Sequence, residues 1–126
     1  KSDPQQETAN IEWHVQPLSL EKFGDPLRTF NAIAPSVCNL RPTSRGNVQI
    51  KSSDPMDYPA IRLNYLSTIA DEKVAVEGLR LTRNIMSAKA LQEFNPQEWK
   101  PGLEAQSEEQ LLESKIEITI LCLLAY

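Results

Sequence analysis

The sequence has few of the residues from which cofactor loops and catalytic centres are commonly built. Its 126 residues include four glycines, two cysteines and a single histidine, His14. It contains no Gly-x-Gly-x-x-Gly fingerprint, no Walker sequence and no Gly-x-Ser-x-Gly elbow, so no dinucleotide-binding loop or hydrolase nucleophile is indicated. A lone histidine also argues against a histidine-based metal cluster or a Cys–His catalytic pair.

A strong excess of one charge and a long hydrophobic run are absent as well. The net charge is −4, and the 13 basic residues are scattered along the chain. A nucleic-acid partner needs a concentrated basic surface, so we expect none. The most apolar stretch, residues 116–126, is far shorter than the ~20 residues that span a bilayer, and we expect a buried terminal strand or helix there.

The cysteines and the start of the chain bear on its cellular context. Cys38 and Cys122 have neither CxxC nor zinc spacing, and two buried thiols are expected in preference to a disulfide. Residues 1–10 are polar, show no cleavable signal peptide and do not begin with Met, which fits a fragment or a processed chain. The expected location is cytoplasmic or peripherally membrane-associated.

Alternating patterns in the first half predict strands. Residues 11–17 alternate: Ile11, Trp13 and Val15 lie on one side and Glu12, His14 and Gln16 on the other, which is the period of a half-buried strand. Residues 30–40 form an apolar run interrupted by Pro35, and residues 47–52 alternate again. A turn at 41–46, with Gly46 supplying backbone freedom, predicts that these two strands form a hairpin. Residues 61–65 predict another short strand, with Tyr65 in the core.

The second half changes to a helical period. Residues 71–91 carry a wide apolar stripe opposite a polar face, and Thr68 with Asp71 resembles a capping box. The stripe comprises Val74, Ala75, Gly78, Leu79, Leu81, Thr82, Ile85, Met86 and Ala88. Ser107, followed by acidic residues, predicts a second helix that ends near Ser114.

This order of elements predicts an α+β fold in a single domain, residues 1–126. Strands come first and a long helix follows, while the short connections between strands favour an antiparallel sheet. We expect the long helix and one or more short helices to pack on one face of that sheet. Arg45 is expected to anchor its turn by an internal pair, and Arg80 and Arg83 to be solvated surface charges.

Three motifs in fixed order carry a family resemblance. They are Pro-x-Ser-Arg-Gly-x-Val at 42–48, Ser-x-Asp-Pro at 52–55 and Pro-x-Ile-x-x-Asn-Tyr-Leu at 59–66. This composite resembles the C-terminal, substrate-binding half of the glucose–methanol–choline (GMC) family of flavin-dependent alcohol oxidoreductases. The resemblance covers about residues 10–112, and the segments 37–42 and 78–83 also resemble the bacterial alcohol and choline dehydrogenase branch.

The resemblance implies a parent protein that binds FAD and oxidises a primary alcohol, choline-like, aliphatic or aromatic, to an aldehyde by hydride transfer to the flavin. This half would roof the substrate cavity and meet the flavin-binding domain of the same parent chain. It also implies that His14 lines that cavity and hydrogen-bonds or polarises the alcohol oxygen. The alternative for His14 is a solvent-facing or hydrogen-bonded strand residue.

The sequence departs from the family after Leu112. The family pattern Thr-x-x-His-Pro-x-Gly-Thr, which carries the catalytic histidine, does not follow, and residues 116–126 are a possible non-family tail. We therefore expect no catalytic residue, no metal and no bound FAD in this fragment, and no turnover by it alone. The alternative is a stand-alone α+β binding module that descends from this domain and uses an exposed sheet face.

Overall fold

The computed structural model describes residues 1–18, 26–114 and 122–124. The strands are β1 (Ile11–Gln16), β2 (Ala32–Asn39), β3 (Asn47–Gln49), β4 (Ala60–Arg62), β5 (Gln97–Lys100) and β6 (Cys122–Leu124). The helices are α1 (Ile69–Met86), the 3-10 helix η1 (Lys89–Phe94) and α2 (Glu108–Glu113). None of the helices in these ranges is long and apolar enough to cross a membrane.

Four of the strands form one antiparallel sheet in the order β1-β2-β6-β5. The first two pair in continuous register, from Ile11 opposite Asn39 to Gln16 opposite Ala34. In β2, Pro35 lacks a backbone donor; within the part of the chain that the structure describes, β6 pairs with Ala32 and Ile33 and not with the proline. The sheet and its helices confirm the predicted α+β class.

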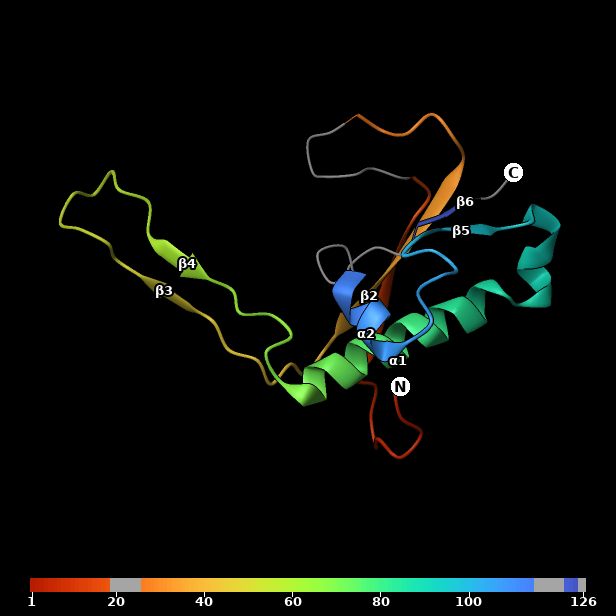
Figure 1. Cartoon of the computed structure of the whole chain (residues 1–126), viewed down its shortest axis with the longest axis horizontal. Helices are drawn as coiled ribbons and strands as arrows, with labels where there is room; N and C mark the ends of the chain where they lie inside the picture. The colour runs from red at the N-terminus through yellow and green to blue at the C-terminus, as the bar shows by residue number, and fades with distance from the viewer. Residues whose placement is uncertain (19–25, 115–121, 125–126) are drawn as a thin grey trace.

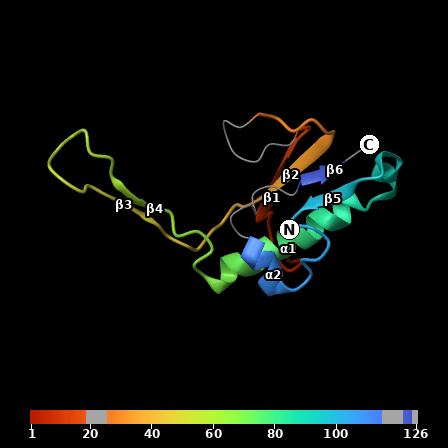
Figure 2. The same ribbon diagram turned by 45° about the horizontal axis from the view of Figure 1, so that its top comes forward.

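Helix α1 packs along the sheet, and α2 packs beside α1 (Figure 1, Figure 2). Gly78 permits the close approach to β2, because a Cβ there would lie 2.9 Å from a methyl carbon of Val37. The indole N–H of Trp13 in β1 donates to the buried Oγ1 of Thr82 at 2.8 Å. Leu79, only 2% exposed, and the fully buried Leu111 of α2 belong to one apolar cluster.

The predicted long helix exists but is shorter than residues 71–91. It ends at Met86, where the Ser87 hydroxyl donates to the Asn84 carbonyl and Ala88 takes up an extended backbone. A serine hydroxyl that bonds the carbonyl of a residue three positions earlier competes with helical hydrogen bonding. Ile85 belongs to the apolar stripe by its spacing but is 47% exposed, so the expectation that it packs against the sheet was wrong.

The second predicted helix is confirmed as α2. Ser107 Oγ accepts from the Gln110 backbone N–H, and Gln110 Oε1 accepts from the Ser107 N–H, which together form a capping box. At α1 only half of the expected box is present. Thr68 Oγ1 accepts from the Asp71 N–H at 3.3 Å, while the Asp71 carboxylate binds elsewhere.

The predicted hairpin of residues 30–40 with 47–52 was wrong. β2 pairs with β1 and β6, whereas β3 pairs with β4 in a separate two-stranded ribbon. We call residues 47–62 the arm; it projects away from the sheet and from α1 in both views (Figure 1, Figure 2). Gly46 is required for a close approach, since a Cβ there would lie 2.2 Å from the Arg62 carbonyl oxygen.

Candidate functional site

The first turn of α1 holds a buried carboxylate at the base of the arm. Asp71 is 3% exposed. Its Oδ1 accepts from the Thr43 N–H at 2.8 Å, from the Thr43 hydroxyl at 3.0 Å and from Asn39 Nδ2 at 3.3 Å. Its Oδ2 accepts from the Ser44 N–H at 2.8 Å. This one side chain therefore ties α1 to the end of β2 and to the loop that leads into the arm.

The electrostatics of Asp71 suit an anchor and not an acid catalyst. Burial by itself raises the pKa of this carboxyl, but the hydrogen bonds from Ser44 and Thr43 outweigh burial and hold the pKa well below its ordinary value. The group is ionised throughout the neutral range. Four donors already occupy its two oxygens, which leaves it poorly suited to take or give a proton.

The family-like motifs meet at the base of the arm, residues 43–45 and 64–67. Ser44 Oγ accepts from the Ser67 N–H at 2.9 Å, and Asn64 Nδ2 donates to the Arg45 carbonyl at 2.9 Å. Asn64 has a φ of 54°, in the left-handed region that asparagine tolerates better than most residues. The first and third motifs thus fix the direction in which the arm leaves the body.

Arg45 acts within its own loop. Its guanidinium donates to the carbonyls of Pro42 at 2.8 Å and of Ser44 at 2.9 Å, while the residue stays largely accessible to solvent. The prediction that Arg45 anchors the turn is confirmed, although its partners are carbonyl oxygens and not a charged side chain.

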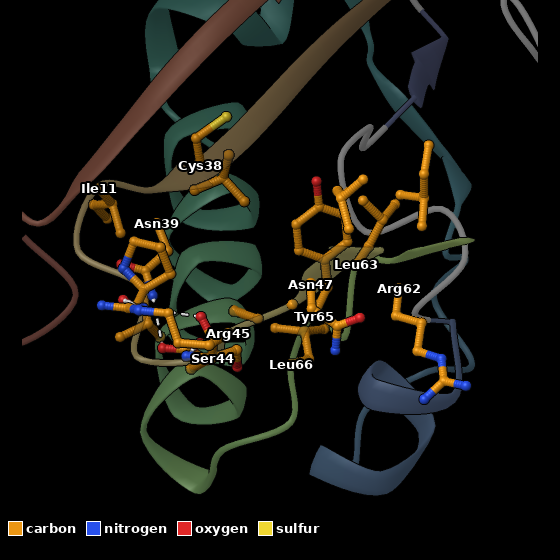
Figure 3. Close-up of a pocket in the computed structure, with 18 residues that line it drawn as sticks. Ile11, Cys38, Asn39, Ser44, Arg45, Asn47, Arg62, Leu63, Tyr65 and Leu66 are labelled. Atoms are coloured by element: carbon orange, nitrogen blue, oxygen red, sulfur yellow. Dashed lines mark hydrogen bonds between the residues drawn. The ribbon is translucent and has the colours of Figure 1, made fainter. Parts of the chain in front are cut away.

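A cavity of about 760 Å³ lies between α1, the end of β2 and the inner part of the arm. Figure 3 shows Cys38 and Asn39 on one side of it and Leu63 and Tyr65 on the other. Its lining is mostly apolar. Tyr65, at the base of the arm, is 76% exposed, so its predicted place in the core was wrong; within the described residues no further layer covers it.

The structure places His14 away from this cavity. His14 lies on β1, and its side chain is 62% exposed. Because Trp13 turns toward α1, strand alternation puts Glu12 and His14 on the opposite face of the sheet. His14 Nε2 is 2.8 Å from Glu12 Oε1. Of β1, only Ile11 contributes to the cavity lining.

Arg83 is not a solvated charge, contrary to the prediction. Its side chain is 18% exposed and makes two bonds of 2.8 and 2.9 Å to the carboxylate of Glu98, itself 4% exposed. It also donates to the carbonyls of Ala105 and Gly102. The ion pair therefore joins α1 to β5 and to the following loop. Arg80 does fit its prediction, since it is 40% exposed and pairs with Glu77 one turn away.

The sequence did not reveal that Asp71 binds the loop at Thr43 and Ser44, nor that Glu98 pairs with Arg83. Both interactions join residues that are distant in sequence. The carboxylate of Asp71 was expected to cap its own helix together with Thr68. No local pattern around Arg83 indicated Glu98 as its partner. Among the described ranges, no group of three or more histidine, cysteine, aspartate or glutamate side chains is placed to hold a metal ion.

The Ser-Arg-Gly and Asn-Tyr-Leu segments that fix the arm lie inside a region that matches a known protein family. The chain belongs to the GMC oxidoreductase family: the model of the family's C-terminal domain, described as GMC oxidoreductase, matches residues 42–121. This confirms the resemblance in the motifs. The match includes residues 116–121, which belong to the possible tail at 116–126. Within that tail the structure describes residues 122–124 only.

Individual members of the family are also similar to this chain. The chain is 37% identical over 113 residues to oxygen-dependent choline dehydrogenases from Staphylococcus aureus strains JH9, Newman and N315. Each alignment covers 90% of this chain but 20% of the relative. The chain therefore spans about one fifth of the length of the curated relatives that it matches.

Proposed function

We propose that this chain is the substrate-binding part of an FAD-dependent oxidoreductase that oxidises a choline-like primary alcohol to an aldehyde. The similarity to oxygen-dependent choline dehydrogenases over 90% of the chain carries the proposal. The family match to a GMC C-terminal domain agrees with it. In this proposal residues 1–126 act as one domain of a longer polypeptide.

The described residues do not fit FAD. A dinucleotide pyrophosphate needs a glycine-rich loop at a helix N-terminus, whereas the first turn of α1 carries Asp71 and Glu72, and the backbone N–H groups of Thr43 and Ser44 beside it already donate to Asp71. We assign FAD binding to the remainder of the polypeptide. The bound flavin would accept the hydride, and no step of that transfer is assigned to residues of this chain.

His14 is proposed as the substrate-facing residue of this chain. Three features support the role: it is accessible, it lies on the face turned away from α1, and it has a carboxylate neighbour in Glu12 at 2.8 Å. A carboxylate that accepts from Nε2–H orients the ring and leaves Nδ1 free. That nitrogen would hydrogen-bond the hydroxyl of an alcohol bound against this face.

The experiment that tests the proposal is a turnover assay on the full-length polypeptide that contains these residues. We expect oxidation of choline or a related primary alcohol with oxygen or an artificial acceptor, and no turnover by residues 1–126 alone. A stand-alone binding module, favoured only by the exposed arm, would give no alcohol oxidation with either protein.

A further inference from the structure

Glu12 and His14 lie next to each other on the face of β1 that is turned away from α1. His14 Nε2 is 2.8 Å from Glu12 Oε1, which is the length of a charge-assisted hydrogen bond. The side chain of His14 is 62% exposed and that of Glu12 is 47% exposed. Both side chains are therefore open to a molecule that binds against this face.

The strand holds the pair in a fixed place. Trp13, between the two residues, donates its indole N–H to the buried Oγ1 of Thr82 in α1 at 2.8 Å. β1 also pairs with β2 in continuous register along its whole length. A site on a strand that is anchored in this way keeps its geometry better than a site on a loop.

The cross-strand neighbours leave the orientation of the imidazole to Glu12. Cys38 lies opposite Glu12 and Ser36 lies opposite His14 in the register of β1 and β2, and residues directly opposite share a face of the sheet. Both are small side chains, so they leave space above the pair. Glu12 supplies the carboxylate that accepts from the ring.

We propose that Glu12 is a positioning residue that makes His14 a hydrogen-bond acceptor for the substrate. The inference rests on the proposed function, in which His14 faces the alcohol. A neutral imidazole that donates its Nε2–H to Glu12 presents the lone pair of Nδ1, and the alcohol hydroxyl donates to that nitrogen. The site therefore favours a hydroxyl donor. The aldehyde product has no O–H, so it cannot make this bond and is held less tightly.

Glu12 acts in this proposal through its reach and not through its charge on the substrate. Residues two apart in a strand are separated by roughly 6–7 Å, so a long side chain is needed to meet Nε2. Glu12→Asp keeps the charge but draws the carboxylate back by one methylene. Glu12→Gln loses the charge but keeps the length and a carbonyl oxygen that accepts from Nε2–H. The two variants therefore separate positioning of His14 from direct attraction of a cationic alcohol.

Turnover by the full-length polypeptide provides the first test. We expect kcat/KM for choline to fall about tenfold in Glu12→Asp, the scale known for carboxylates that orient histidines in metal sites, and about two- to threefold in Glu12→Gln. The melting temperature should hardly move, since the Glu12 side chain is 47% exposed. In the His14→Ala background, Glu12→Asp should add no further loss, because a residue that acts through another has no effect once that residue is removed.

The opposite pattern would overturn the proposal. A larger loss in Glu12→Gln than in Glu12→Asp, or an undiminished further loss in the His14→Ala background, would assign Glu12 to direct contact with the substrate. An active protein whose Glu12 variants depart from the expected order refutes the positioning role alone. A protein that oxidises no alcohol refutes the proposed function and, with it, the contact between His14 and a substrate.

Nitrogen NMR of the untagged 126-residue chain tests the geometry without any turnover. His14 is the single histidine of the sequence, so the two ring-nitrogen signals belong to it. In alkaline buffer, where the imidazole is neutral, we expect the proton on Nε2 in the wild type and in Glu12→Gln, and a larger fraction with the proton on Nδ1 in Glu12→Asp. The same ratio of the two tautomers in all three proteins would contradict the proposal, whatever the activity of the full-length protein.

Discussion

The carboxylate of Asp71 joins three segments, and its replacement should be costly. Asp71→Asn keeps the shape but removes the charge, and its amide N–H₂ must face the N–H donor of either Thr43 or Ser44, because these two donors bind different oxygens of Asp71. We expect a loss of about 2–3 kcal/mol in the free energy of unfolding, typical of hydrogen bonds to a buried charge. Urea unfolding followed by circular dichroism measures it. The exposed Glu93→Gln is the control and should change the midpoint little.

Asp71 also predicts a pH dependence. Its pKa in the folded protein lies below the ordinary value, so the unfolded state binds the proton more readily. The stability that Asp71 contributes is therefore complete above the unfolded pKa of about 3.9 and is lost as pH falls through the lower folded pKa. Urea midpoints of wild type and Asp71→Asn should differ by a constant amount from pH 5 to pH 7, and the difference should begin to shrink only below about pH 4. A gap that widens on acidification contradicts this assignment.

His14 predicts a catalytic effect without a structural one. In the full-length protein, His14→Ala should lower kcat/KM for the alcohol by ~10–100-fold, which is a typical effect of removing one hydrogen-bonding catalytic partner. Its side chain is 62% exposed, so the melting temperature should hardly move. Gln16→Ala, on the same face of β1, is the matched control. Unchanged kinetics with a much lower melting temperature would make His14 a structural residue.

The ion pair between Arg83 and Glu98 joins α1 to β5, and its loss should lower the free energy of unfolding. Arg83→Met would leave Glu98, 4% exposed, without its counter-charge, and the loss of one buried partner costs about 3–5 kcal/mol. Chemical unfolding should show this loss, with partial recovery in the double variant Arg83→Met/Glu98→Met. Arg80→Met, on the same helix but more exposed, should cost less than about 1 kcal/mol. If the two arginine variants lost the same free energy of unfolding, the buried pair would contribute no more to stability than the exposed one.

Elements defined by local patterns could be predicted from the sequence. The alternation of residues 11–17 predicted β1, which ends one residue earlier at Gln16, and the capping residues Thr68 and Ser107 marked the starts of α1 and α2. Strand partners could not be predicted in the same way. The turn at 41–46 looked like a hairpin turn, but its loop is bound by Asp71, 27 and 28 residues further along the chain. That contact directs the chain away from the sheet, and no local pattern reveals it.

Errors about burial have a related cause. Tyr65 and Ile85 are apolar or aromatic residues at positions of correct period, yet they are 76% and 47% exposed. Periodicity says which face of an element is apolar, and it does not say whether another layer covers that face. The candidate site shows the same limit, since the likeness of a short motif could single out His14 but could not place its neighbours.

The whole molecule consists of a sheet-and-helix body and an uncovered arm (Figure 1). The body has its own buried cluster around Leu79 and Leu111. The arm has no comparable cluster among the described residues, and its apolar side chains Val48 and Ile61 are exposed. This division suits a domain whose function depends on the rest of a longer oxidoreductase, as does its match to one fifth of the length of its relatives.

Anaerobic flavin spectroscopy tests this view of the molecule most directly. The full-length polypeptide is purified, its visible flavin absorption is recorded, and choline is added without oxygen. We predict that the visible flavin band is present and bleaches on addition of choline, because a bound flavin that takes the hydride becomes reduced, and that residues 1–126 alone show no such band. A full-length protein that binds no flavin, or stoichiometric FAD on residues 1–126 alone, would contradict the proposed function.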